Sequence, residues 1–150
     1  MMPTSFDKVI DMALITVSDY KLKKLYEQDV EKFNVWCDGF LIAAIPDFSL
    51  CRQSLSYDEE KREFHNELTP MEIRILADFW VLEWFSRETQ DATQIARTLN
   101  VSSAFTSHSA AQNLKEKSTY VDKLREKVEQ KINDYLLMTM TDEEQAALSS

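Results

Sequence analysis

The two histidines are the first residues that could support acid–base or metal chemistry. His65 follows an acidic run that contains Asp58 and Glu59, so a site built from these three side chains can be drawn. His108 has no partner at a ligand spacing, and the sequence contains no H-E-x-x-H or other paired-histidine pattern. We therefore predict that the chain has no metal site.

Asp78 and Glu83 are the second candidate, because both carboxylates lie in the most apolar segment of the sequence. Two carboxylates that lie close together in apolar surroundings can share a proton at raised pKa. Their separation along the chain, however, places the two side chains well apart around a helix. We expect Asp78 and Glu83 to form independent salt bridges with basic residues of neighbouring helices.

Signatures of nucleophilic and phosphate chemistry are missing from the sequence. The serines stand in no G-x-S-x-G turn, and the cysteines in no cysteine–histidine signature. Gly39 is the one glycine, so neither glycine-rich phosphate loop can be written. Cys37 and Cys51 lie in apolar or mixed surroundings, which favours buried thiols over a disulfide. We predict a protein that is not an enzyme and has no catalytic, cofactor-binding or metal-binding residues.

Composition and charge narrow the class of protein further. The 150 residues suit one domain, and one glycine with three prolines leaves little turn chemistry for a sandwich or barrel, so we predict an all-α fold. The net charge of −9 opposes general binding to nucleic acid or anionic lipid. No apolar run reaches the ~18 residues of a membrane span. Asp7 and Asp11 interrupt the first apolar stretch, which also lacks the features of a signal peptide, so we expect a soluble cytoplasmic product.

Two N-terminal segments carry apolar residues at helical spacing. Residues 5–17 predict one amphipathic helix, and residues 30–45 predict a second that ends at Pro46. Gly39 lies inside the second helix, where it costs about 1 kcal/mol relative to alanine, so we expect a close helix crossing there. Residues 47–68 have mixed polarity and predict a short helix or loop at the surface.

A central helix is predicted to begin at a capping box formed by Thr69 and Glu72, with Pro70 at the first helical position. Apolar residues in the segment 73–85 cover nearly every direction around the axis, so other helices must surround it. The predicted core of the bundle consists of Ile73, Leu76, Trp80, Trp84, Phe40, Val121, Leu124 and Val128.

A long helix is predicted from Ser103 to about Met138. It would span roughly 50 Å at ~1.5 Å per residue, more than one small globule needs to cover its core. We therefore expect part of this helix to pack against another chain. Residues 1–138 are interpreted as a single helical domain, and residues 139–150 as a C-terminal tail.

The segment 94–102 is similar to the first helix and turn of a helix-turn-helix, with Ala96 at the small-residue position and Asn100 at the turn. The recognition helix would then occupy residues 103–113, which contain no lysine or arginine for phosphate contacts. An intracellular helix-turn-helix DNA-binding regulator is therefore our alternative hypothesis. An oligomeric helical scaffold of unrelated role is a third.

Four stretches lie in a recognisable order along nearly the whole chain. They are residues 6–17 with 19–22, residues 39–48, residues 68–72 with 81–84, and Phe105 with 109–116. In this order they resemble the N-terminal helix and turn, the end of the second helix, the central helix and the start of the last long helix of head-to-tail connector (adaptor) proteins. These are neck proteins of long-tailed bacteriophages that infect Gram-positive hosts.

The resemblance implies a structural protein of the virion neck, synthesised in the host cytoplasm. Such proteins are small helical bundles that form a homo-oligomeric ring, typically a dodecamer, beneath the portal protein at the portal vertex. The ring extends the DNA channel and offers a docking surface for the stopper or tail-completion protein. Genomic DNA would pass through the lumen without sequence-specific binding, and a net negative protein suits that passage. No membrane partner is implied.

The end of the long helix is the candidate interface with the portal or a neighbouring subunit, because apolar residues continue there in a loose alternation. We expect this segment to be mobile in the free protein and to order on a partner by adding a strand to an exposed edge. The alternative is a helix that frays into a disordered acidic tail. The candidate residues are Leu136, Leu137, Met138, Thr139, Met140 and Thr141.

Overall fold

The computed structural model describes residues 2–17, 20–99 and 104–149. Within these residues the helices are α1 (Phe6–Thr16), α2 (Tyr20–Gln28), α3 (Val30–Ala44), α4 (Pro70–Leu99), α5 (Ala104–Met138) and α6 (Asp142–Ser149), with a 3-10 turn, η1 (Ile45–Asp47). The short strands β1 (Thr4–Ser5), β2 (Tyr57–Asp58) and β3 (Glu63–Phe64) form an antiparallel sheet in the order β1-β3-β2. The prediction of a small, mainly helical fold is confirmed.

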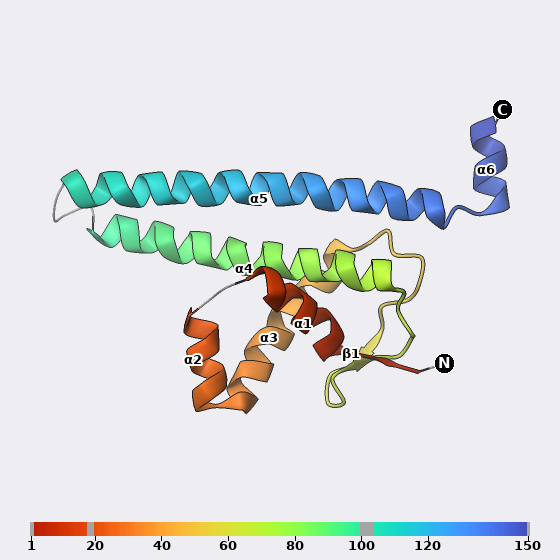
Figure 1. Ribbon diagram of the computed structural model, residues 1–150, viewed down its shortest axis with the longest axis horizontal. Coiled ribbons are helices and arrows are strands. Elements are labelled where there is room, and N and C mark those ends of the chain that lie inside the picture. The colour runs from red at the N-terminus through yellow and green to blue at the C-terminus, as the bar shows by residue number, and fades with distance from the viewer. Residues whose placement is uncertain (1, 18–19, 100–103, 150) are drawn as a thin grey trace.

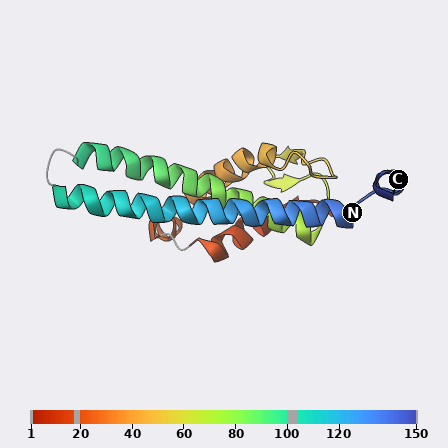
Figure 2. The ribbon, with the colours of Figure 1, turned by 90° about the horizontal axis from the view of Figure 1, so that it is seen from above.

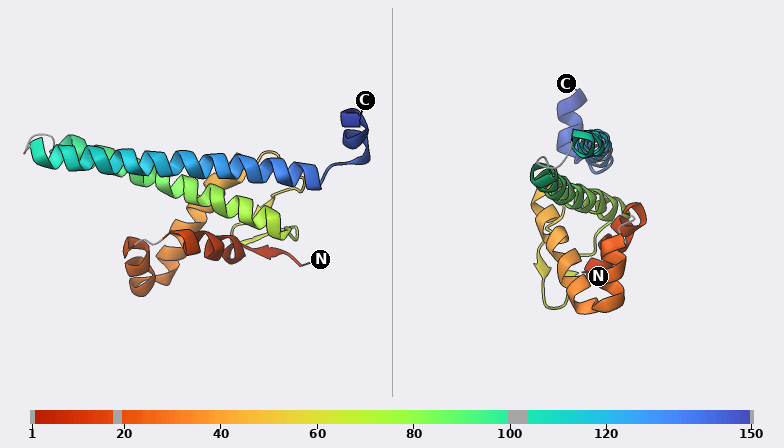
Figure 3. Two further views of the ribbon diagram at one scale, coloured as in Figure 1. Left: turned by 45° about the horizontal axis from the view of Figure 1, so that its top comes forward. Right: turned by 90° about the vertical axis from the view of Figure 1, so that its left-hand side faces the viewer.

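An antiparallel hairpin of α4 and α5 organises the molecule (Figure 1). α1 and α3 pack against the first half of α4, and α5 lies along its opposite side (Figure 3). The far end of the hairpin extends beyond α1, α2 and α3 (Figures 1 and 2). α4 is therefore covered on several sides near its start, as the sequence predicts, while its second half is paired mainly with α5.

The N-terminal helix begins at Ser5, whose Oγ accepts a hydrogen bond from the Asp7 N–H at 3.2 Å. This capping bond satisfies one of the free N–H groups of the first turn. The buried side chains of α1 follow the predicted three and four spacing; they are Phe6, Val9, Ile10 and Ala13.

The segment 47–68 differs from its prediction as a surface helix or loop. It contains the two strands β2 and β3, and it contributes Phe48, Phe64 and Leu68 to the core. Arg62 ends the turn between these strands with a φ of 54°, a left-handed conformation that glycine usually occupies. Strands of two residues are too short to show an alternating pattern, which is why the sequence did not reveal the sheet.

An ion pair holds the small sheet against the helices. The Arg62 guanidinium donates to both carboxylate oxygens of buried Asp38 on α3, at 2.7 and 2.8 Å. A further bond of 2.9 Å reaches Asp7 on α1. Asp38 is therefore a buried charge with a bidentate partner, the arrangement that a buried carboxylate requires.

The predicted capping box of α4 is present. The Glu72 N–H donates to Thr69 Oγ1 at 3.3 Å, and the Thr69 N–H donates to Glu72 Oε1 at 2.8 Å. The helix then continues to Leu99, so residues 94–99 end this long helix and do not form the separate helix of a helix-turn-helix. α5 returns antiparallel to α4 (Figure 2), whereas a helix-turn-helix places its helices at ~90–120°. The predicted turn residue Asn100 and the predicted helix start Ser103 lie outside the described residues.

Trp80 lies at the centre of the core. It is fully buried, and its indole N–H donates to the Cys37 carbonyl at 2.9 Å. Its ring meets the Phe40 ring edge-on, with centroids 5.3 Å apart. Of the other predicted core residues, the structure buries Leu76, Leu124 and Val128, and it leaves Ile73, Trp84 and Val121 partly exposed.

Gly39 does not mark a close helix crossing, so that prediction is wrong. A Cβ atom built at this position would meet nothing within 4 Å. The glycine lies on the exposed side of α3, although its neighbours Asp38 and Phe40 are buried. Its effect is to leave a hollow beside the helix.

The C-terminal segment is helical, in contrast to the predicted strand-like alternation or disordered tail. Leu136, Leu137 and Met138 complete α5, and residues 139–141 connect it to α6. The Thr141 hydroxyl accepts the Glu144 N–H at 3.2 Å. Thr141 and Glu144 thus have the spacing of a capping box, a helix-start signal that the sequence contains and the prediction missed.

Candidate functional site

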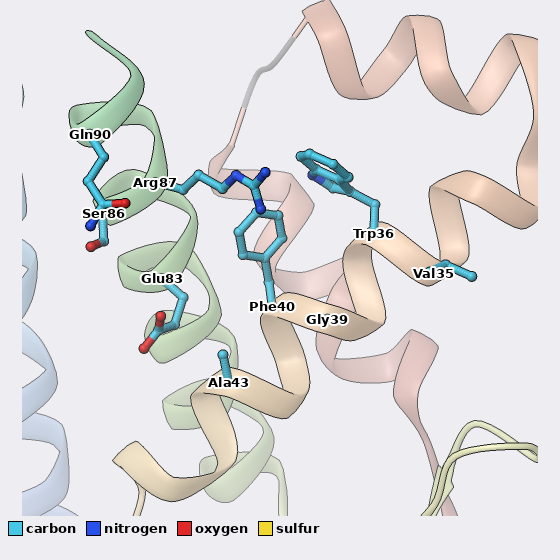
Figure 4. Close-up of a pocket in the computed structure, with 9 residues that line it drawn as sticks. All are labelled: Val35, Trp36, Gly39, Phe40, Ala43, Glu83, Ser86, Arg87 and Gln90. Carbon is cyan, nitrogen blue, oxygen red and sulfur yellow. The ribbon is translucent and has the colours of Figure 1, made fainter. Parts of the chain in front are cut away.

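A groove of about 470 Å³ lies between α3 and α4, and side chains of both helices line it (Figure 4). α3 contributes Val35, Trp36 and Phe40, and α4 contributes Glu83 and Arg87. The remaining lining residues are small or uncharged, and they are Gly39, Ala43, Ser86 and Gln90. The groove therefore has an apolar side, a charged side and a surface that lacks large side chains where Gly39 lies.

Trp36 dominates the apolar side of the groove. Its side chain is 41% exposed, and it packs edge-on against Phe40 with centroids 5.9 Å apart. The Arg87 guanidinium lies over the indole, 4.5 Å from the ring centroid, in a cation–π contact (Figure 4). Two neighbouring hollows of about 540 and 220 Å³ also include Trp36. One half-exposed tryptophan thus borders three hollows, a feature typical of the anchor residues of protein interfaces.

Further exposed apolar residues lie on α2 and α3. Val35 is 73% exposed, and Val30 and Tyr26 are also exposed on the same pair of helices, α2 and α3. Single exposed apolar residues are ordinary, but Val35 and Trp36 line the groove together, which indicates an interaction surface there.

Glu83 lies at the other end of the groove and pairs with an acid. Its carboxyl group hydrogen-bonds to Asp47 in η1; burial, this bond and the negative charge of Asp47 raise the pKa of Glu83 to about 7. The predicted salt bridge of Glu83 to a basic residue is therefore wrong. η1 follows Pro46 and brings Asp47 against α4, a contact that helical spacing does not reveal. The predicted bridge of Asp78 is confirmed, because it pairs with Lys131 of α5.

A buried polar cluster joins the start of α4 to the end of α5. Glu72, which is 1% exposed, accepts hydrogen bonds from the Tyr135 hydroxyl at 2.6 Å and the Gln53 amide at 2.6 Å. Cys51 adds a longer bond from Sγ at 3.4 Å. Burial raises the pKa of Glu72, but these donors and the Thr69 N–H outweigh burial and leave it below its usual value. The cluster fixes both helices to the loop 51–53.

Arg52 extends this cluster to α6. Its backbone N–H donates to the Tyr135 hydroxyl at 2.7 Å, and its Nε donates to Thr139 Oγ1 at 3.2 Å. The two terminal guanidinium nitrogens form a bidentate pair with Glu144 at 2.9 and 2.7 Å. The direction of α6 is therefore set by one arginine, whose own position is fixed by Tyr135.

The predicted interface residues 136–141 lie at this end of the molecule, far along the hairpin from the groove (Figure 1). Leu137 and Met138 are 61% and 76% exposed. Leu136 and Met140 are half-buried, while Thr139 and Thr141 are exposed and make the bonds described above. Among the predicted residues, Thr139 accepts a bond from Arg52, which the sequence did not single out.

The residues that could do chemistry are dispersed. His65 Nδ1 lies 3.1 Å from Ser56 Oγ in an exposed position, and the structure gives no side-chain description for His108. Over residues 2–17, 20–99 and 104–149, no three histidine, cysteine, aspartate or glutamate side chains gather as metal ligands would.

Both cysteines are free thiols. Burial and the charge of Asp38 raise the pKa of Cys37 to about 12, and burial raises that of Cys51 to about 11, so both thiols stay protonated at neutral pH.

Trp36 lies in the segment 30–45, whose apolar spacing predicts a helix but does not identify this tryptophan as a surface residue. Val35 carried the missed signal, because it is apolar and lies off the stripe that Phe33, Cys37 and Phe40 define.

None of the helices in the described ranges is long and apolar enough to cross a membrane. No protein-family model, curated protein or solved structure matches this chain.

Proposed function

We propose that this chain is a structural protein of a phage virion, a head-to-tail connector whose copies form a ring beneath the portal protein. The ring would extend the DNA channel and dock the stopper or tail-completion protein. The sequence resemblance suggests the assignment, and the hairpin of α4 and α5 is the structural observation that carries it. In this proposal the protein performs no chemistry.

The hairpin supports the proposal because its far end projects beyond the helices that pack on its first part (Figures 1 and 2). α5 has 35 residues, and its main packing partner is α4. The end of the hairpin extends past the other helices (Figures 1 and 2). A projecting hairpin can lie beside the hairpin of a neighbouring copy, and repetition of one such contact around an axis produces a ring.

Charge supports passage of DNA through such a ring. The chain has a net charge of −9, so the summed field of many copies would repel the phosphate backbone. A channel that transmits DNA must avoid the phosphate contacts by which DNA-binding proteins hold their sites. The alternative of a helix-turn-helix regulator receives less support, because its first predicted helix is the end of the continuous α4.

The test is electron microscopy and mass measurement of the purified protein, alone and with the portal protein encoded in the same genome. We expect rings, or rings bound to the portal. The matched control is duplex-DNA titration at moderate salt, in which we expect no sequence-dependent binding. A monomer that ignores the portal, or sub-micromolar sequence-specific DNA binding, would refute the proposal.

A further inference from the structure

The helix α6 stands away from the rest of its own chain. None of its residues is buried, and Leu148 is 69% exposed. It rises from the end of α5 on the side opposite α1, α2 and α3 (Figures 1 and 3). The bidentate pair of Arg52 with Glu144 holds it in this direction. α6 is therefore a helix whose leucine is left exposed by its own chain, and we call this helix the arm.

The groove between α3 and α4 is the surface of this chain that best suits such an arm. It offers the exposed face of Trp36 to an apolar side chain, and it lacks large side chains at Gly39 and Ala43, where another helix can approach closely. Arg87 lies over the same tryptophan and supplies a positive charge. α6 carries Asp142, Glu143 and Glu144 in its first turn and alanines with Leu148 beyond them.

The arm cannot reach the groove of its own chain. Residues 139–141 join α5 to α6, and three extended residues span only about 10 Å. The groove is lined by Glu83 and Arg87, midway along α4 (Figure 4). α3, its other wall, lies on the side of the hairpin opposite α6 (Figure 1). The occupant must therefore come from another molecule.

We propose that α6 docks in the groove between α3 and α4 of a second copy of this chain. Leu148 packs on the indole of Trp36, and Asp142 and Glu143 in the first turn of α6 face Arg87, while Glu144 stays paired with Arg52 of its own chain. Glu83 at the far end of the groove disfavours the reverse orientation, which would bring the acidic turn towards a carboxylate. This inference rests on the proposed ring and names the contact that closes it.

The contact has a direction, because arm and groove are different surfaces. Each copy gives its arm to one neighbour and receives an arm from another, which is a heterologous interface. Such an interface cannot stop at two copies unless one arm or one groove is disabled. This property makes the inference testable by mixing variants.

The test compares Trp36→Ala, which damages the groove, with Leu148→Glu, which damages the arm. Ile15→Glu is the matched control, because Ile15 is 86% exposed on α1 and does not line the groove. Circular dichroism first checks that all three variants are folded. We expect each of the first two to raise the protein concentration needed for assembly by at least tenfold, and the control to leave it unchanged. An equal mixture of the first two variants should give a dimer and no ring.

Disulfide trapping separates this inference from the ring itself. Copies with Gln90→Cys in the groove are mixed with copies with Ala146→Cys in the arm under mild oxidation. The control pair replaces Gln90→Cys with Glu59→Cys. We expect the disulfide-linked dimer of the first pair to form faster than that of the control pair. Equal trapping of both pairs, or rings that survive Trp36→Ala and Leu148→Glu, would overturn the docking inference and leave the proposed function intact. A wild-type chain that never forms rings but still gives the specific mixed dimer would refute the ring alone.

Discussion

The hydroxyl of Tyr135 lies 2.6 Å from Glu72 Oε2, and both residues are almost fully buried. This bond joins the last turns of α5 to the first turn of α4, two points separated by more than sixty residues in the chain. The same bond positions the Tyr135 hydroxyl so that its oxygen accepts a hydrogen bond from the Arg52 N–H. One phenol therefore determines both how the hairpin closes and where α6 is anchored.

Removal of this hydroxyl should destabilise the fold. In Tyr135→Phe, buried Glu72 loses a donor and the Arg52 N–H loses its acceptor, so we expect a loss of about 1–3 kcal/mol in the free energy of unfolding. Urea denaturation measures the change. Tyr26→Phe, at an exposed site, is the control and should change stability by less than about 0.5 kcal/mol. Equal behaviour of the two variants would show that the buried bond contributes nothing.

The pairing of Glu83 with Asp47 predicts a dependence of stability on pH. The folded-state pKa of Glu83 is raised to about 7 from 4.5, by burial first and then by the hydrogen bond and charge of Asp47. A raised acid pKa means that the folded state favours the protonated carboxyl, so its stabilising effect is complete below pH 4.5 and is lost as pH rises through 7.

Glu83→Gln should therefore stabilise the protein above pH 7. We expect a gain of about 1 kcal/mol at pH 8, a figure reduced for the solvent screening of a partly exposed group, and little difference from wild type at pH 4.5. Urea denaturation at the two pH values measures this. Glu59→Gln, at an exposed turn, is the control. A loss of stability at pH 8 would show that the glutamate forms a favourable charge pair.

The helices were more predictable than their connections, for a physical reason. Apolar periodicity reports which face of a helix is buried, and it located α1, α3 and the start of α4 to within a few residues. The capping box of Thr69 and Glu72 was visible because it depends on neighbours in sequence. The second function of Glu72, as acceptor for Tyr135, was not visible, because that partner comes from the other end of the hairpin.

The candidate site was predicted less well, because it depends on residues whose exposure is a tertiary property. Trp36 and Trp80 are both apolar residues on a helical stripe, yet one is fully buried and the other borders three hollows. Which face of α3 meets α4 is decided by packing that composition does not encode. Residues 136–141, which the sequence predicts to be strand-like, form the end of α5 and its connection to α6, and their role as an interface stays a prediction.

Two tryptophans on α4 provide a test of the core. Trp80 is fully buried and Trp84 is only partly buried. We expect Trp80→Ala to cost about 3–5 kcal/mol, because it empties a large site that cannot collapse, and Trp84→Ala to cost less. Denaturant titration of both variants measures the difference. A cost below about 1 kcal/mol for Trp80→Ala would place this face of α4 outside the core.

The last prediction concerns the anchoring of α6 by Arg52. Arg52→Ala removes the bidentate pair with Glu144 and the bond to Thr139, while its backbone N–H can still donate to Tyr135. We expect faster amide hydrogen exchange throughout α6 and unchanged exchange in the buried first half of α4. The rate of exchange by local opening of a helix depends on the contacts that this helix makes, so the effect should stay confined to α6.

Arg52→Lys is the matched control for this prediction. Lysine keeps the positive charge but cannot form the two parallel bonds of the guanidinium, so exchange in α6 should be intermediate between that of wild type and that of Arg52→Ala. Equal exchange in wild type and Arg52→Ala would mean that the backbone at residues 139–141 sets the direction of α6 unaided. Because the docking of α6 on a second copy benefits from an arm held in place, Arg52→Ala should also weaken assembly, and less severely than Leu148→Glu.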